Sequence, residues 1–316
     1  MRMADTSVPA TARLIERPRD YAALVERPNF REVLNRKEHK LRRVLSGYSF
    51  QALIRCGLAD CRTPHREGFL VETDDGLETN VGHVCGRNAF GTRFDVERAS
   101  YERARELQDL KDRAKHLQTQ VTPAVQMVQE LYKSGFGVEW IENIKSSLYR
   151  VVGGDLLSSL EATERRREFG VNQARRRTEE EINRFVAETR RRRTELVFET
   201  TQVGSLEPMP WLVFDFKGKL ITNLVKCFQD FQYLDVDQLQ TPVLRQRVKA
   251  LDGWELRVRE AEEAISTAHR FLASENIELL SLWIPEAHKR YRSSVAEWAA
   301  SPALQKLRLG RVPTDA

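Results

Sequence analysis

Apolar residues recur at steps of three and four over most of the chain after Gly91, and this period limits the fold more than any other feature. One such seam comprises Leu107, Leu110, Ala114, Leu117 and Val121. This spacing places apolar side chains on one helix face and is typical of coiled-coil-like packing. Pro123, the glycines of residues 134–137 and the Gly153-Gly154 pair are expected to interrupt the helices. The sequence therefore predicts a mainly α-helical fold.

The last third of the chain has the same helical character. Thr241-Pro242 is a favourable pair for the start of a helix, and Gly253 interrupts the pattern that follows. Near-heptad steps there join Leu244, Val248, Leu251, Val258, Ala261, Ile265, Ala268 and Leu272. We expect coiled-coil-like helices and a charged arm over residues 96–200 and a C-terminal helical bundle over residues 201–316.

Helical spacing also precedes the cysteine-rich part of the chain. The residues at this spacing are Phe30, Val33, Leu34, Leu41, Val44 and Leu45, and the pattern ends at Ser46-Gly47. We expect residues 1–12 to be disordered and residues 13–47 to form an N-terminal helical segment. The stretch "YSFQALI" that follows predicts a short strand leading into Cys56.

Residues 68–82 carry the pattern of a β-hairpin. The strands "GFLVET" and "LETNVG" flank Asp74-Asp75-Gly76, and an Asp-Gly pair tolerates the positive φ of a tight turn. Apolar and polar residues alternate on both sides of this turn. The sequence therefore predicts an antiparallel hairpin here.

Three of the four cysteines and two of the six histidines lie within residues 53–91. The N-terminal residues contain no continuous apolar stretch, so we expect no secretory signal. The apolar run "LLSLWI" is far shorter than the roughly 18 residues of a membrane span. We therefore expect a cytoplasmic protein, in which clustered cysteines are metal ligands more often than disulfides.

The spacing of these residues predicts a zinc site with the ligands Cys56, Cys61, His83 and Cys85. The glycine after Cys56 lets the backbone turn between two sulfurs, and the hairpin returns Cys85 to the same point. His83 precedes Cys85 by two residues, so both side chains leave an extended strand on one face. His65 is the alternative fourth ligand. Four protein ligands would make the Zn2+ structural rather than catalytic.

The order of a turn with two ligands, a hairpin, further ligands and a helix resembles a treble-clef or zinc-ribbon-like module. This resemblance covers roughly residues 48–100, and we place the zinc-stabilised β-hairpin module at residues 48–95. The C-x2-C pairs of the standard pattern are missing, and Asn88 stands where a ligand at the start of the helix is expected.

Arginine runs mark residues 164–196, which predict a long, charged helical arm. Between Glu161 and Glu195 there are 11 arginines and 8 glutamates, and many of them are spaced as i,i+4 pairs. A solvated arm is therefore favoured over a binding surface for nucleic acid.

A second basic cluster lies close to the cysteines. Basic residues there that would contact phosphates, if the protein binds nucleic acid, are Arg36, Lys37, Lys40, Arg42, Arg43 and Arg87. No aromatic residues alternate with these charges as a base-stacking surface requires. The whole chain has 51 Lys and Arg against 46 Asp and Glu, an excess too small to indicate a nucleic-acid partner.

These patterns favour a non-enzymatic, zinc-binding, coiled-coil interaction or scaffold protein that binds a protein partner or self-associates through its helices. The alternative is a nucleic-acid-associated zinc-finger protein that uses the basic residues near the finger and the arginine-rich helix. A metal-dependent nuclease is the least favoured, because no histidine follows His83 before His116. We find no catalytic constellation of paired carboxylates, nucleophile elbow or phosphate loop.

Overall fold

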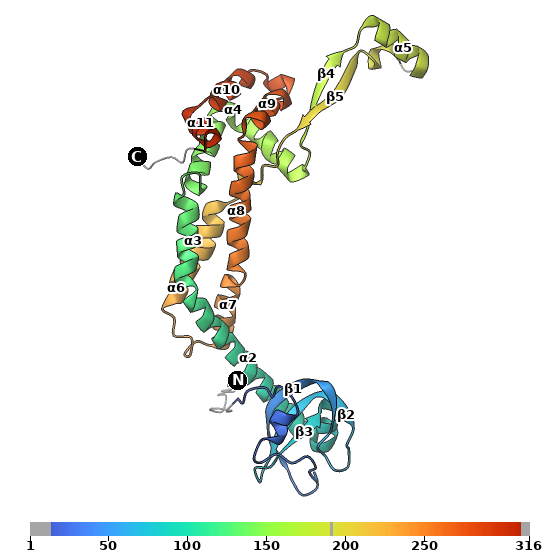
Figure 1. Ribbon diagram of the computed structural model, residues 1–316, viewed down its shortest axis with the longest axis vertical. Coiled ribbons are helices and arrows are strands. Elements are labelled where there is room, and N and C mark those ends of the chain that lie inside the picture. Colours follow the sequence, from blue (N-terminus) through green and yellow to red (C-terminus); the bar gives the residue numbers. More distant parts are fainter. Residues whose placement is uncertain (1–13, 190–191, 311–316) are drawn as a thin grey trace, which may run out of the picture. The chain divides into compact units, whose positions relative to one another are not determined.

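The computed structural model describes residues 14–189 and 192–310, and the chain divides into two compact units. The first unit contains the residues up to Lys115 together with Val236–Arg245, and the second contains His116–Asp235 and the residues from Gln246 onward. Helices predominate, and two small antiparallel sheets accompany them (Figure 1). The mainly α prediction is confirmed. The predicted disorder of residues 1–12 lies outside the described residues.

A three-stranded antiparallel sheet organises the first unit (Figure 1). Its strands are β1 (Leu41–Arg55), β2 (Pro64–Thr73) and β3 (Glu78–Gly82), in the order β1-β2-β3. The predicted hairpin is present, with Phe69 opposite Val81 and Val71 opposite Thr79. Its turn uses Gly76 at a φ of 85°, a conformation that side-chain-bearing residues rarely adopt. We call residues 14–101, which hold this sheet, the β module.

The predicted N-terminal helical segment is wrong. Before β1 the structure has one short helix, α1 (Ala22–Val25), and Phe30 and Leu34 form isolated bridges to Glu78 and Leu58. The physical reason lies in β1, which is buried on both faces. Leu41 and Val44 pack with Val71 and Phe94, whereas Leu45, Tyr48 and Phe50 belong to a second apolar cluster with Leu24 and Leu70. Bulges in the pairing with β2 shift the register, so the apolar residues mimic helical spacing. The strand predicted over residues 48–54 is part of β1.

Helix α2 (His83–Thr119) follows β3 without a loop and is kinked at Gly91, where φ is 58°. The second unit continues with α3 (Val121–Lys133) and α4 (Val138–Arg166), which are separated at residues 134–137 as predicted. Gly153 interrupts α4 with a φ of 71°. Ala114, Leu117 and Val121 of the predicted seam are buried within the chain, and the coiled coil remains a prediction.

The C-terminal part is helical, as expected. Thr241 begins α7, and Gly253, at a φ of 67°, separates α7 from α8. The elements of this part are η2 (Pro210–Leu212), the π-helix η3 (Lys217–Val225), α6 (Lys226–Gln232), α7 (Thr241–Leu251), α8 (Trp254–Phe271), α9 (Ser274–Trp283), η4 (Glu286–His288), α10 (Tyr291–Ala299) and α11 (Pro302–Arg308).

The continuous helical arm predicted for the arginine-rich segment is also wrong. Helix α4 ends at Arg166, and the chain then forms a two-stranded antiparallel ribbon of β4 (Gly170–Arg176) and β5 (Phe198–Ser205) (Figure 1). Between these strands lie α5 (Glu179–Thr189) and η1 (Arg193–Glu195). We call residues 170–205 the ribbon; within them, 190 and 191 lie outside the described residues.

Ion pairs across the ribbon replace the i,i+4 pairs of the expected helix. Arg175 lies opposite Glu199 in the strand register and contacts both Glu199, at 2.8 Å, and Glu181, at 2.9 Å. Opposite charges facing each other across two strands stabilise a ribbon as well as i,i+4 pairs stabilise a helix. The charge pattern alone therefore does not distinguish the two structures.

Phe94 provides a test of the β module, because its side chain is fully buried between Phe69 and the start of α2. Phe94→Ala is expected to lower the free energy of unfolding of this module by about 3–5 kcal/mol. The matched control Val96→Ala, at a position that is 59% exposed on the same helix, is expected to change it little.

Urea unfolding followed separately for the two units measures this effect. All five tryptophans, at positions 140, 211, 254, 283 and 298, lie in the second unit, so tryptophan fluorescence reports on that unit alone. Circular dichroism reports on both. An unchanged unfolding curve for Phe94→Ala would contradict the packing described here.

Candidate metal centre

A tight turn between β1 and β2 positions the first two cysteines. Cys56 follows the last residue of β1, and its backbone N–H donates to the Thr63 carbonyl at 3.1 Å. Gly57 donates to the Asn80 carbonyl at 2.7 Å. A Cβ at Gly57 would lie 2.0 Å from the Thr79 hydroxyl oxygen, so only glycine fits this close approach to β3. The turn thereby places Cys56 and Cys61 beside the end of β3.

Cys85 reaches the same point from the first turn of α2. This helix begins at His83, directly after β3, and Gly86 lies against the ring of Phe94. A Cβ at Gly86 would be 2.5 Å from that ring, so glycine allows the two parts of the kinked helix to approach. The hairpin and the kink in α2 together fix the position of the third sulfur.

The Sγ atoms of Cys56, Cys61 and Cys85 all lie within 4.8 Å of one another. The sulfurs of Cys61 and Cys85 are 3.1 Å apart, and all four cysteines of the chain are reduced. Cys56 is buried, and the other two are partly buried. Among the described residues no other group of three or more His, Cys, Asp or Glu side chains converges in this way. These three cysteines can hold a metal ion.

Hydrogen bonds to the sulfurs suit thiolate ligands. The Cys56 sulfur accepts backbone hydrogen bonds from Leu58 and Gly82. The Cys61 sulfur lies 3.3 Å from the Thr63 hydroxyl and also contacts the Thr63 backbone. Donors of this kind stabilise negative charge on sulfur and orient a ligand around a metal.

The three thiols differ in acidity because their surroundings differ. Burial raises the pKa of Cys56, although the Leu58 and Gly82 hydrogen bonds oppose it. Burial and the neighbouring Cys61 sulfur raise the pKa of Cys85 to about 12. Burial also acts to raise the pKa of Cys61, but hydrogen bonds with Thr63 and Cys85 outweigh it, so the pKa of Cys61 is lowered. Cys61 is the first of the three to ionise.

The two histidines predicted as ligands, His83 and His65, do not belong to the group formed by the three cysteine sulfurs. His83 is exposed, and its ring lies against Phe69 and Phe94, with both centroid distances 6.4 Å. His65 lies on β2 opposite Ile54, with its Nε2 2.7 Å from the Tyr48 hydroxyl. The structure therefore brings together three of the four predicted zinc ligands.

Sequence reasoning missed Thr63 and the backbone donor at Gly82. The glycines after Cys56 and Cys85 were visible in the sequence as signs of tight turns around sulfur. No sequence signal pointed to Gly82, since it approaches Cys56 only through the pairing of distant strands.

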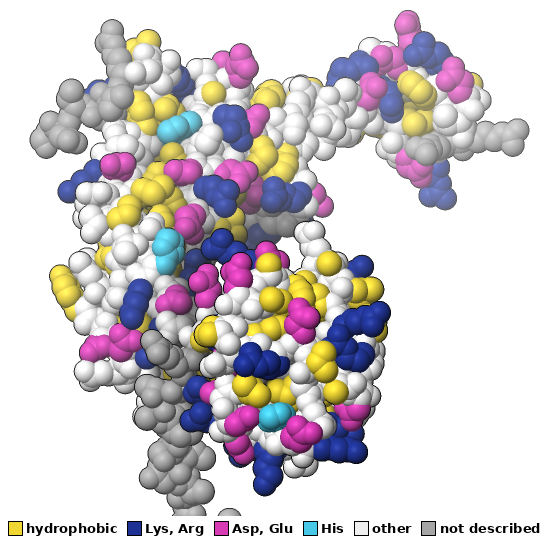
Figure 2. Space-filling model, turned by 60° about the horizontal axis from the view of Figure 1, so that its bottom comes forward, with side chains coloured by type: hydrophobic (Ala, Val, Ile, Leu, Met, Phe, Trp, Pro, Cys, Tyr) yellow, Lys and Arg dark blue, Asp and Glu magenta, His cyan; other side chains and the backbone are white. Residues whose placement is uncertain are grey.

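The basic residues predicted to contact phosphates are largely engaged with carboxylates. Arg36 contacts Asp60 at 2.7 Å, Arg42 and Arg43 both contact Glu72, and Arg87 contacts Asp95 at 3.4 Å. Lys37 and Lys40 are both exposed. Figure 2 shows basic and acidic side chains interspersed over the forward face of the β module. The arrangement forms no continuous basic surface on that face.

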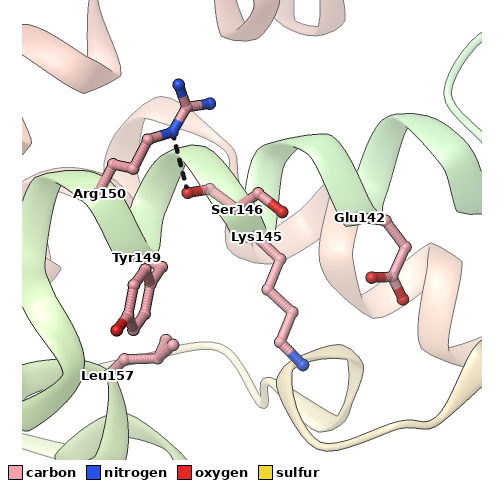
Figure 3. Close-up of a pocket in the computed structure, with 6 residues that line it drawn as sticks. All are labelled: Glu142, Lys145, Ser146, Tyr149, Arg150 and Leu157. Carbon is pink, nitrogen blue, oxygen red and sulfur yellow. Dashed lines mark hydrogen bonds between the residues drawn. The ribbon is translucent and has the colours of Figure 1, made fainter.

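A shallow pocket along α4 offers no catalytic arrangement. It is lined by Glu142, Lys145, Ser146, Tyr149, Arg150 and Leu157 (Figure 3). The Lys145 ammonium donates to the Leu212 carbonyl, and the Arg150 guanidinium donates to the Ser146 carbonyl at 3.4 Å. Both cations thus bond to backbone, and no lining side chain pairs a nucleophile with a base.

No protein-family model, curated protein or solved structure matches the chain. Within the residues that the structure describes, no helix combines the length and the apolar character needed to cross a lipid bilayer. The function must therefore be argued from the residues themselves.

The pKa differences predict the order in which the thiols react. After metal is removed by a chelator, iodoacetamide is expected to alkylate Cys61 before Cys56 and Cys85, because only thiolates react at an appreciable rate. Because its pKa is lowered, the alkylation rate of Cys61 is expected to fall off at a lower pH than that of an ordinary cysteine.

Mass spectrometry of peptides after timed alkylation at several pH values gives the three rates. Thr63→Val tests the cause of the low pKa of Cys61, because it removes the hydroxyl beside Cys61 and leaves the other two thiols unchanged. It is expected to move the pH profile of Cys61 to higher pH. Faster alkylation of Cys85 than of Cys61 would contradict the arrangement.

Proposed function

We propose that this protein is a non-catalytic interaction or scaffold protein whose β module is held together by a structural zinc ion. Cys56, Cys61 and Cys85 provide three of its ligands. The observation that carries the proposal is the convergence of three sulfurs within 4.8 Å from the β1–β2 turn and the start of α2. Three soft thiolates favour zinc among the metals common in reducing compartments.

A structural role follows from what the metal would join. The module has a three-stranded sheet whose apolar residues divide into two small clusters, one on each face. Small units with little core often depend on a metal or a disulfide. A metal at the three sulfurs would link the β1–β2 turn to α2 and hold the helix against the sheet. Its free energy of binding would then add to that of folding.

The interaction role is supported by the ribbon. Most side chains of β4 and β5 are exposed, and the base of the ribbon packs on α9, where Gly204 lies against Leu279. An isolated two-stranded ribbon is marginally stable in water. Here ion pairs from Arg175, and the Arg177 guanidinium 4.5 Å from the centre of the Phe185 ring, support it. Phe198, which is 61% exposed, adds an apolar surface that suits a protein partner better than a nucleic acid.

The nucleic-acid alternative has less support from the described residues. Its basic contacts near the cysteines are mostly paired with carboxylates, and the arginines of the ribbon lie among glutamates. Each such pair must be broken or rearranged before a phosphate replaces the carboxylate. We therefore retain a protein partner, or a second copy of this chain, as the proposed partner.

The metal is tested by its stoichiometry and by its effect on stability. Purified full-length protein is expected to contain about one zinc ion per chain, and a chelator is expected to unfold or loosen the first unit while tryptophan fluorescence of the second stays unchanged. Cys56→Ser together with Cys85→Ser should abolish zinc binding, because one thiolate cannot hold the ion.

Cys227→Ser is the matched control, since Cys227 lies outside the cluster in α6. It should retain one zinc ion per chain. Zinc-free protein with unchanged circular dichroism after chelation would reject the structural metal.

Light scattering distinguishes self-association of this chain from binding of nucleic acid. At micromolar concentration and low salt, self-association predicts a mass that is a multiple of 36.6 kDa and does not change when mixed DNA or RNA fragments are added. A mass that rises with nucleic acid, and falls back as salt increases, would support the alternative. A monomer in both samples would reject self-association.

A further inference from the structure

We propose that Cys61 and Cys85 form an oxidation site, at which hydrogen peroxide joins the two sulfurs in a reversible disulfide bond. The inference goes beyond the proposed function, because it rests on the geometry of two thiols and not on a bound metal. It is carried by the distance between the sulfurs, by the backbone that holds each of them, and by their exposure compared with that of Cys56.

The two sulfurs are already in contact. The Sγ atoms of Cys61 and Cys85 are 3.1 Å apart. A disulfide bond is about 2 Å long, so the two atoms must approach by about 1 Å to form one. Thiolates at neighbouring corners of a zinc tetrahedron are about 3.8 Å apart, so a metal requires them to separate slightly. The observed distance lies between these values, and small side-chain movements lead from it to either state.

The turn between β1 and β2 holds Cys61 in this position. Its backbone N–H donates to the Leu58 carbonyl at 3.1 Å. The next residue, Arg62, has a φ of 50°, and its guanidinium donates to the carbonyls of Glu32, at 2.6 Å, and Cys56, at 3.2 Å. These bonds tie the turn to the segment before β1 and fix where the Cys61 side chain begins.

Cys85 meets Cys61 on the same face of the sheet. It lies in the first turn of α2. Both cysteines pack against one apolar cluster, which contains Val81 and Phe94. The two side chains therefore need to cross no strand in order to bond. The bond would join the β1–β2 turn to α2, which are the two parts that the proposed metal would also link.

Exposure separates this pair from the other two cysteines. Cys56 is 0% exposed, whereas Cys61 and Cys85 are partly exposed. Peroxide in solution therefore reaches the sulfurs of the pair more readily than that of Cys56. Cys227 lies in the second unit, outside the cluster. Of the four cysteines, all within the described residues, Cys61 and Cys85 alone combine contact between sulfurs with access for an oxidant.

The reaction takes two steps and needs only peroxide as the oxidant. In the first, the sulfur of one thiol attacks a peroxide oxygen: an S–O bond forms, the O–O bond breaks, and water leaves with the thiol proton. In the second, the other sulfur attacks this sulfenic acid: the S–S bond forms, the S–O bond breaks, and a second water leaves. The two thiols lose two electrons, and the peroxide is reduced to two waters.

Thiol counting and peptide mapping of the full chain test the inference. After a chelator has removed any metal, one equivalent of hydrogen peroxide is expected to lower the number of thiols, counted in denaturant, from four to two. Mass spectrometry of unreduced peptides should find Cys61 linked to Cys85, and dithiothreitol should restore all four thiols. Cys227→Ser is the matched control and should lose the same two thiols.

Oxidation in concentrated urea shows whether the fold selects the pair. In an unfolded chain the shorter loop closes more readily, so Cys56 should link to Cys61 in preference to Cys85. A Cys56–Cys61 bond in the folded protein, a disulfide between chains or four thiols that survive the peroxide would each overturn the inference.

The metal content of the same preparation separates this inference from the proposed function. A chain that binds no zinc but forms the Cys61–Cys85 bond would overturn the structural metal and leave the oxidation site standing. A chain that binds zinc and, once stripped of it, forms no such bond would do the reverse.

Discussion

Three sulfurs held within 4.8 Å by the backbone are the constraint on which the β module depends. They cannot all be ionised at this distance without a cation, since each negative charge raises the cost of the next. The acidity of the thiols reflects this conflict: the pKa of Cys61 is lowered, whereas that of Cys85 is raised to about 12. A divalent ion would remove the conflict and release protons as it bound.

The backbone around the sulfurs is closely packed. Gly57, Gly68, Gly82 and Gly86 each stand where a Cβ would meet a neighbouring group. These close approaches bring the β1–β2 turn, the end of β3 and the start of α2 together, and they leave backbone N–H groups pointing at sulfur. Glycine at each of these positions thus allows close packing around the site rather than flexibility of the chain.

The sequence allowed parts of this structure to be predicted because some patterns have one physical meaning. Asp74-Asp75-Gly76 between alternating strands specifies a hairpin, and Gly253 and Thr241-Pro242 specify helix ends. The convergence of the three cysteines was also predicted, since the hairpin had to return Cys85 towards Cys56. Local patterns of this kind do not depend on distant parts of the chain.

Other parts could not be predicted because their patterns have two meanings. Val44 and Leu45 are neighbours that face opposite apolar clusters, and a strand buried on both faces with bulges gives the apolar spacing of a helix. Arg175 and Glu199 pair across a ribbon, but the same charges also fit an exposed helix. The fourth ligand is the same kind of problem, since His65 and His83 are both close to a cysteine in sequence.

The number of protein ligands would decide the kind of role that the metal can have. Three thiolates alone would leave a zinc coordination position open to water, as catalytic sites require, whereas a fourth protein ligand would close the centre. A closed centre would act in folding rather than in catalysis. The ribbon presents exposed strands and Phe198, and ion pairs of Arg175 support it. Under the proposed function, the metal centre and the ribbon would have separate roles, one in folding and one in binding.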